Sequence, residues 1–272
     1  MKYAVLADLH LGSGLERRDV GEAMQRLRDE GYTLVLAGDV FDLWREKDAA
    51  KEFSHLLGGE DIVLRGNHDH DLDLPGVRVL DSVTLESGWR RFFVTHGDVV
   101  DFVYGFAKLE HLRSTGAGRW WERLLANLRR WKAEDVYSFY DAMKYAPEWA
   151  VHALEHGGSD WRKKLQALAV LVVITLASFQ KDRGPSFPHR PSLDGGVLDQ
   201  APEELCQRIL GFYPEAEPCD TVIMGHLHRP ARHDVVTPHG RRYELVVLGA
   251  WVKGSAPTVA LIHEGRCEVR SV

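Results

Sequence analysis

The sequence predicts an α/β protein built on a mostly parallel sheet. Short apolar runs recur along the chain, and they are continuous rather than alternating, which is typical of strands covered on both faces. Segments with helical periodicity separate the first of these runs, and strand–helix–strand alternation is the pattern of a parallel sheet. The runs, each with the polar residues that follow it, lie at residues 3–10, 33–42, 61–69, 91–98 and 221–228.

Two helices are expected between the first three runs. In the first, four apolar residues recur at helical spacing with charged residues on the other side: Val20, Ala23, Met24 and Leu27. The second is expected within residues 48–60. Near the end of the chain, three further apolar segments are predicted to be strands that close the domain, the last two as a hairpin; they lie at 241–251, 257–265 and 267–272.

The interval from 99 to about 200 departs from this alternation. It holds five of the eight tryptophans, together with a cluster of basic residues and long stretches compatible with helix. We therefore predict one domain over residues 1–272 with a helical insertion at about 100–200, placed over one end of the sheet. Within the insertion, the residues that we expect to contact a substrate are Arg119, Trp120, Trp121 and Arg123.

Composition excludes several classes of protein. A chain of 272 residues with 44% hydrophobic content can bury a full core. Its net charge of -6 gives no overall basic footprint, so nucleic acid is not an expected partner. The three cysteines form neither a disulfide framework nor a zinc pattern, which favours a reducing cytoplasm. Asp8 interrupts the N-terminal apolar run too early for a signal peptide.

Residues 165–179 are almost wholly apolar and are flanked by charged residues. These 15 residues are fewer than the roughly 20 that an α-helix needs to cross a bilayer. We expect a buried helix here, with contact to a membrane surface as the alternative.

Polar side chains follow the apolar runs at the points where the strands are expected to end. The carboxyl ends of parallel strands share one edge of a sheet, so these side chains should converge in space although they are dispersed in the sequence. Each one alone is explained as well by a helix cap, a turn or a buried histidine, but five strand ends together are not. In chain order they are Asp8, His10, Asp39, Asp42, Asn67, His68, His96, Asp98, His226 and His228.

Two local expectations follow from the same segments. The imidazoles of His226 and His228 point the same way if the strand end stays extended. His70, Asp71 and Asp73 lie beyond the end of the third strand and are expected to be solvated loop residues.

The types of side chain in this set suggest a metal centre. Carboxylate, amide and imidazole ligands without thiolate suit divalent ions such as Mn²⁺, Fe²⁺ or Zn²⁺. The set is larger than one ion needs, and a shared carboxylate can bridge two ions about 3.5–4 Å apart. Such a pair lowers the pKa of a bound water to produce hydroxide and holds both oxygens of a phosphoryl displacement. We therefore predict a hydrolase that cleaves a phosphoester or pyrophosphate bond.

Five short motifs resemble the signature motifs of the calcineurin-like metallophosphoesterases, in the order of that family. They are DLH (8–10), GDVFD (38–42), GNHD (66–69), THGD (95–98) and GHLH (225–228). The resemblance implies a four-layer α/β/β/α sandwich of two partly mixed sheets, with the helical insertion as a lid. It also implies two divalent ions, Mn²⁺ first, with Fe²⁺, Zn²⁺ or Mg²⁺ as alternatives.

The resemblance assigns roles to the residues of these motifs. Asp8, His10, Asp39 and His228 would hold the first ion. Asp39 would bridge to the second, which Asn67, His96 and His226 would complete. The catalytic residue would be His68, outside the metal shell, where it stabilises phosphoryl oxygens or protonates the leaving group. Asp42 and Asp69 would orient a ligand or His68.

Within this family, three further stretches resemble the UDP-2,3-diacylglucosamine diphosphatases of lipid A biosynthesis. They are ADLHLGSG (7–14), MGHLHRPARH (224–233) and VVLGAWVKGS (246–255). This resemblance implies a lipid-linked substrate that is split into UMP and lipid X. It also implies a cytoplasmic protein, peripheral at the inner membrane, whose insertion contacts the membrane surface.

Two departures keep other substrates open. That branch usually carries arginine at the position of His68, and its insertion is usually shorter. The alternatives are a phosphodiesterase or phosphatase acting on a nucleotide, a nucleic acid or a phosphoprotein. A protein-binding scaffold with the same fold is the alternative from another class. Scaffolds of this kind typically lose metal ligands, whereas here every expected position is filled.

Overall fold

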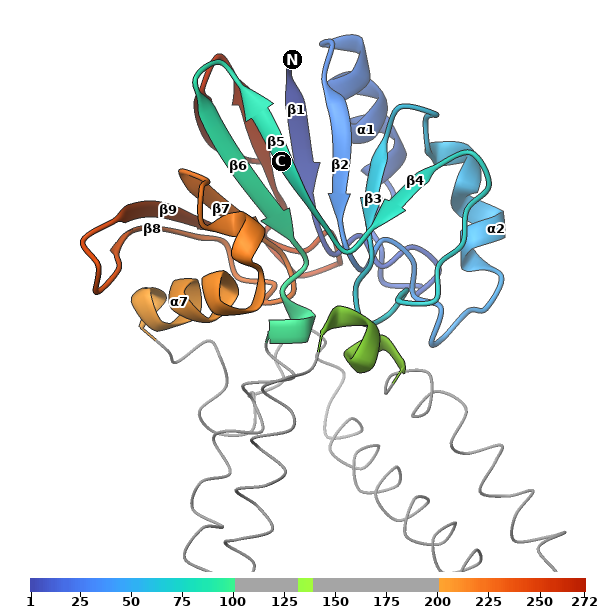
Figure 1. Cartoon of the computed structure of the whole chain (residues 1–272). Coiled ribbons are helices and arrows are strands. Elements are labelled where there is room, and N and C mark those ends of the chain that lie inside the picture. Colours follow the sequence, from blue (N-terminus) through green and yellow to red (C-terminus); the bar gives the residue numbers. More distant parts are fainter. Residues whose placement is uncertain (101–131, 139–200) are drawn as a thin grey trace, which may run out of the picture.

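Two β-sheets face each other in the computed structural model, which describes residues 1–100, 132–138 and 201–272 (Figure 1). The six-stranded sheet has the order β11-β10-β1-β2-β3-β4. Strands β1 to β4 are parallel, and β10 and β11 add an antiparallel hairpin beside β1. The bounds are Tyr3–Leu6 (β1), Thr33–Ala37 (β2), Ile62–Leu64 (β3), Arg78–Leu80 (β4), Thr258–His263 (β10) and Arg266–Ser271 (β11).

The five-stranded sheet has the order β5-β6-β7-β9-β8. Its three inner strands are parallel, and the two edge strands run antiparallel to their neighbours. The bounds are Ser82–Ser87 (β5), Arg90–Thr95 (β6), Thr221–Met224 (β7), Ala231–Val236 (β8) and Arg242–Val247 (β9).

Strand β1 shows why the apolar runs are continuous. Tyr3 and Val5 contribute to the core between the two sheets, whereas Ala4 and Leu6 contribute to the core under α1 (Val20–Asp29). Because alternate side chains of a strand point to opposite faces, a strand covered on both faces needs apolar residues at every position. The expected helix is therefore α1, and its apolar stripe is buried as predicted.

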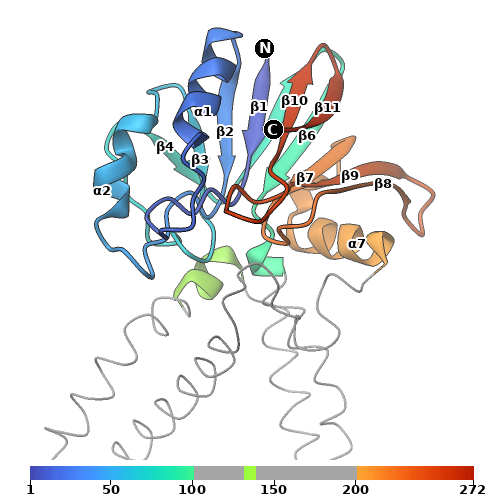
Figure 2. The same ribbon diagram turned by 180° about the vertical axis from the view of Figure 1, so that it is seen from behind.

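Helices cover the outer face of each sheet. α1 and α2 (Ala49–Phe53), which a 3-10 turn at Ser54–Leu56 follows, lie on the six-stranded sheet. α7 (Pro202–Phe212) packs Leu205 and Ile209 on the five-stranded sheet, with a 3-10 turn at Pro214–Ala216 after it. Figure 2 shows these layers from behind, and the four-layer α/β/β/α sandwich is confirmed.

Some elements differ from the prediction. The strands form the two mixed sheets that the family resemblance implies, and five of the nine neighbouring strand pairs are parallel. The strands β4, β5 and β8 were not predicted, because each is partly exposed and carries polar residues that hide the apolar pattern.

The predicted insertion lies outside the described residues, except for 132–138. Residues 133–138 are helical and bury Val136 and Tyr137 against Val99 and Phe212. The apolar segment 165–179 also lies outside them. Within the described ranges, no helix has the length and apolar character that a bilayer crossing requires.

Candidate metal centre

The loops that follow β1, β2, β3, β6 and β7 supply the predicted polar residues. The carboxyl ends of β1, β2, β3 and β6 point to the same edge of the molecule, at the bottom of Figure 1, beside residues 132–138. The parallel pairing of β6 with β7 extends this edge into the second sheet. Side chains more than 200 positions apart in the sequence therefore meet.

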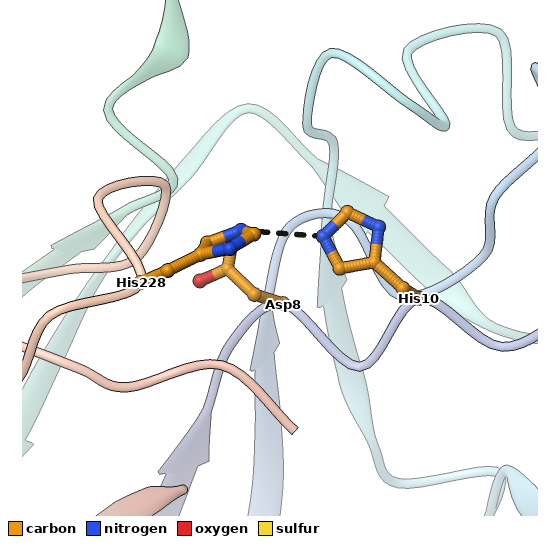
Figure 3. Close-up of side chains that lie close together, drawn as sticks. All are labelled: Asp8, His10 and His228. Atoms are coloured by element: carbon orange, nitrogen blue, oxygen red, sulfur yellow. Dashed lines mark hydrogen bonds and ion pairs between the residues drawn. The ribbon is translucent and has the colours of Figure 1, made fainter. Parts of the chain in front are cut away.

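The first group of side chains comprises Asp8, His10 and His228, whose ligand atoms lie within 4.8 Å of one another. His228 Nε2 is 3.2 Å from Asp8 Oδ1 and 3.3 Å from His10 Nε2. Figure 3 shows the two imidazole rings approaching from loops of different sheets, with the Asp8 carboxylate beside them. Burial lowers the pKa of His10 to about 4, so its ring is neutral at neutral pH, the form that binds metals.

A second group comprises Asp8, Asp39 and His96, again within 4.8 Å. Asp39 faces both groups, because its Oδ1 lies 3.4 Å from His96 Nε2 and its Oδ2 lies 3.8 Å from His10 Nε2. A carboxylate with one oxygen toward each group has the placement that a bridging ligand requires. The ring of His226 lies 5.2 Å from that of His96, centroid to centroid.

Two of the predicted metal ligands have a buried atom that makes no hydrogen bond among the described residues: Asn67 Oδ1 and His96 Nε2. Buried polar atoms are nearly always hydrogen-bonded, and here the protein supplies only the ion-pair contact of His96 Nε2 with Asp39 at 3.4 Å. Both are lone-pair donors of the type that divalent cations accept. Together with the two groups, they fit a pair of divalent ions.

The backbone at these positions is unusual. Six non-glycine residues of the described chain have positive φ, and five of them belong to the predicted metal set. Residues in the left-handed region are uncommon and cluster at functional sites. The five, with φ between 48° and 67°, are Asp8, His10, Asp39, His226 and His228.

These φ values overturn one expectation. The chain does not stay extended after β7, so the imidazoles of His226 and His228 do not project as neighbours on one strand face. His228 lies against Asp8, whereas the ring of His226 lies beside that of His96. The left-handed turns thus direct one imidazole of the GHLH motif to each group.

The glycines before three ligand-bearing residues have a steric role that the sequence-based prediction did not include. A Cβ on Gly38 would lie 2.4 Å from the ring of His96, and one on Gly66 would lie 2.3 Å from Asp39 Oδ1. A Cβ on Gly225 would lie 2.6 Å from Asp8 Oδ2. The signal was present in the motifs, where each glycine stands immediately before Asp39, Asn67 or His226.

His68 forms a pair with Asp42. Its Nδ1 lies 2.9 Å from Asp42 Oδ1, and its backbone N–H donates to Asp39 Oδ1 at 2.8 Å. The ring is also close to His10, with centroids 4.8 Å apart. Burial lowers the pKa of His68, but the negative charges of Asp39 and Asp42 outweigh it, so the pKa is raised above its usual value.

Asp69 joins two of the ligand-bearing loops. Its Oδ2 accepts hydrogen bonds from the backbone N–H groups of Val40 (2.7 Å) and Phe41 (3.2 Å), which follow Asp39. Its Oδ1 accepts one from the N–H of Gly66 (2.8 Å), which precedes Asn67. The carboxylate is fully buried, and it therefore fixes the loop after β2 to the loop after β3.

The prediction for His70 is wrong, whereas Asp71 and Asp73 are exposed as expected. The His70 side chain is only 3% exposed because its ring stacks on Tyr137 of the 133–138 helix. Trp44 was also missed: its Nε1 donates to the carbonyl of Asn67 at 2.7 Å, at the rim of the site. The predicted substrate contacts of the insertion lie outside the described residues: Arg119, Trp120, Trp121 and Arg123.

Comparison with known proteins agrees with the fold and with this geometry. The family model of the calcineurin-like phosphoesterases matches residues 1–230. The chain is similar to the UDP-2,3-diacylglucosamine hydrolase of Bordetella parapertussis, with 27% identity over 90% of this chain and 83% of that protein. It is also similar to the enzymes of the same name from Cellvibrio japonicus (24% identity, 92% and 91% covered) and Coxiella burnetii (32%, 38% and 43% covered). The chain therefore belongs to the calcineurin-like phosphoesterase family and is a metal-dependent phosphohydrolase.

Proposed function

We propose that the chain hydrolyses the pyrophosphate bond of UDP-2,3-diacylglucosamine. Water adds to one phosphorus, and the bridging oxygen leaves with the other phosphate, which yields UMP and lipid X (2,3-diacylglucosamine 1-phosphate). The placement of Asp39 between two groups of ligand atoms carries the phosphohydrolase chemistry. The names of the relatives, which align over up to 92% of the chain, support the choice of substrate.

The ions that we propose are two Mn²⁺. Asp8, His10 and His228 would hold the first with Asp39, and Asn67, His96 and His226 would hold the second. When bound, such a pair lowers the pKa of a water and neutralises phosphoryl oxygens. The burial of Asp8 and Asp39 and the unpartnered Asn67 Oδ1 support this assignment.

We propose His68 as the catalytic residue. Its Nδ1 is held by Asp42, so Nε2 is the ring atom left to face a phosphoryl oxygen or the leaving oxygen. The raised pKa of His68, on which Asp39 and Asp42 outweigh burial, favours the protonated ring that can donate to either. Asp42 is then a positioning residue that fixes the ring and supports its charge.

The remaining assignments concern the insertion and the location of the protein. We propose that Arg119, Trp120, Trp121 and Arg123 contact the lipid-linked substrate, because apolar and cationic side chains suit acyl chains and phosphate respectively. We propose from this substrate that the protein is cytoplasmic and peripheral at the inner membrane. The absence of a disulfide framework is in line with this location.

A second candidate is a phosphodiester or phosphomonoester substrate without the lipid. The observation that favours it is the imidazole of His68 at a position where the diphosphatase branch usually has arginine. An imidazolium can protonate a leaving alkoxide, a step for which the less acidic guanidinium is poorly suited.

Incubation of the manganese-loaded chain with UDP-2,3-diacylglucosamine, beside ATP, cyclic nucleotides and a phosphopeptide, tests the choice. We expect release of UMP from the first substrate at a rate at least tenfold above the others. Bis-p-nitrophenyl phosphate reports the chemistry of the metal centre independently of the substrate. If this ester is cleaved and UDP-2,3-diacylglucosamine stays intact, the enzyme class stands and the proposed substrate is wrong.

A further inference from the structure

A short two-stranded ribbon stands next to the candidate metal centre. Glu16 and Val252 form an antiparallel bridge, the N–H of Arg17 donates to the carbonyl of Trp251 at 3.0 Å, and the N–H of Lys253 donates to Leu15 at 2.8 Å. The base of the ribbon is joined to the loop that carries the first ligands, because the N–H of Trp251 donates to the carbonyl of Asp8 at 2.9 Å. The ribbon is thus held in place by the same turn that presents the metal ligands.

The ribbon forms one wall of a groove of about 370 Å³ that residues 17–19 and 252–255 line. We call it the ribbon groove. Its charge is positive, since three cations and one carboxylate line it. Arg17 is paired with Asp19 at 2.6 Å, which leaves Arg18 and Lys253 as uncompensated charges. Arg18 is exposed and makes no ion pair among the described residues, and Lys253 Nζ makes only a long hydrogen bond of 3.4 Å to the carbonyl of Gly14.

Two further observations point to a ligand. The hydroxyl oxygen of Ser255 is buried and has no hydrogen-bond partner in the described part of the chain. Beside it, Gly254 has φ +85°, and a Cβ at this position would meet nothing within 4 Å, so the space in front of the turn is open. Buried hydroxyls are normally paired, and a glycine turn gives a ligand close access to the backbone.

The groove also adjoins the start of α1, which begins at Val20. Asp19 is the residue before this helix, but its side chain makes no capping hydrogen bond because it is paired with Arg17. The positive end of the helix is therefore not capped by a side chain and adds to the field of Arg18 and Lys253. A phosphate group is typically bound by cationic side chains, hydroxyls and the backbone N–H groups at a helix N-terminus, and this groove has all three.

We propose that the ribbon groove is a second phosphate-binding site, separate from the metal centre, with Arg18, Lys253 and Ser255 as its side-chain donors. The site goes beyond the proposed function, because cleavage at the metal centre does not require it. The groove is open to solvent, so a phosphate that carries a further group is not excluded by its walls. A remote phosphate of a substrate, a phospholipid headgroup and free phosphate share this chemistry.

The test compares the full chain, loaded with Mn²⁺, with the double variant Arg18→Ala/Lys253→Met and with the control Arg266→Ala. Arg266 is an exposed cation in the β10–β11 hairpin, at the opposite end of β10 from the groove. Calorimetric titration with inorganic phosphate should show one equivalent fewer bound to the double variant than to the parent and the control. Ser255→Ala should weaken that same equivalent severalfold and leave the number of sites unchanged.

The metal centre supplies an internal reference. Inhibition of bis-p-nitrophenyl phosphate hydrolysis by phosphate should stay within twofold in all variants, because the groove is not the cleavage site. An equal number of phosphate equivalents in the parent and the double variant would overturn the proposal. If no variant hydrolyses the ester, the proposed function fails, but the binding stoichiometry still tests the groove.

Two further arms identify the source of the phosphate. A tenfold higher KM of the double variant for UDP-2,3-diacylglucosamine, with unchanged KM for bis-p-nitrophenyl phosphate, assigns the groove to a substrate. Weaker sedimentation with phosphatidylglycerol vesicles, but not with phosphatidylcholine vesicles, assigns it to a membrane headgroup. If neither changes while the equivalent of inorganic phosphate is lost, the groove takes free phosphate.

Discussion

Replacing Gly38 by alanine should disable the metal centre through a single methyl group. Gly38 precedes Asp39 and has φ +82°, and a Cβ there would lie 2.4 to 2.6 Å from three atoms of the His96 side chain, two of them in the ring. Carbon atoms in contact lie about 3.5 Å apart or more, so the ring or the backbone must shift by about 1 Å. Neither can move freely, because His96 is 1% exposed and its Nδ1 is held at 3.0 Å by the carbonyl of Ala37.

Gly240 provides a matched control. It has φ +77° in the turn between β8 and β9, and a Cβ there would meet nothing within 4 Å. Because alanine is strained at a positive φ, its introduction at either position should lower the free energy of unfolding by about 1–2 kcal/mol. Only Gly38→Ala adds overpacking, worth about 1–3 kcal/mol. The difference between the two variants therefore isolates the contact with His96.

Three measurements follow from this comparison. Denaturant unfolding should show that Gly38→Ala loses about 1–3 kcal/mol more stability than Gly240→Ala. Because a 1 Å misplacement at an active site costs on the order of 100-fold in rate, kcat/KM for bis-p-nitrophenyl phosphate should fall by about that factor in Gly38→Ala alone. Bound manganese should fall as well. Equal stability, metal content and rate in the two variants would refute the steric role of Gly38.

Other substitutions separate the roles of the neighbouring carboxylates and His68. Asp39→Ala should lose bound manganese, whereas His68→Ala should keep the metal and lose rate; the same metal content and the same rate in both would reject this division. Asp42→Asn should lower the pKa of His68, because the Asp42 charge helps to raise it against the effect of burial. The alkaline limb of the kcat profile should then move to lower pH, and an unmoved limb would count against His68 as the proton donor. Asp69→Ala leaves three backbone N–H groups without their acceptor, whereas Asp69→Asn keeps one acceptor. Each unsatisfied N–H lowers the free energy of unfolding by at most about 1–3 kcal/mol. Unfolding experiments should place the asparagine variant between the parent and the alanine variant, and the reverse order would contradict this role.

The sequence was informative about the site because the inner strands of both sheets are covered on both faces. A continuous apolar run identifies such a strand, and the ligand-type residue directly after it then marks the shared edge. Asp8, Asp39 and His96 all follow their runs in this way, and the structure brings them within 4.8 Å. Periodicity located α1 equally well, because Met24 and Leu27 face a sheet and the intervening residues face solvent.

Other features depend on contacts that no local pattern records. Edge strands such as β5 and β8 have one exposed face, and their polar residues obscure the period of two. The burial of His70 comes from Tyr137, a residue 67 positions away in the predicted helical insertion, and no local pattern links the two. The left-handed backbone at His226 is likewise set by tertiary packing, because its N–H donates to the carboxylate of Asp8 from the other sheet.

At the five left-handed positions the backbone favours glycine, whereas the metal centre needs a side chain. Glycine at residues 8, 10, 39, 226 or 228 would relax the backbone by about 1 kcal/mol each while removing a side chain from the centre. The polypeptide thus retains a local cost that bound cations help to offset, since cations that bind the native chain shift its unfolding equilibrium by mass action. Withholding divalent ions during growth should therefore deplete the soluble protein, and not merely silence it.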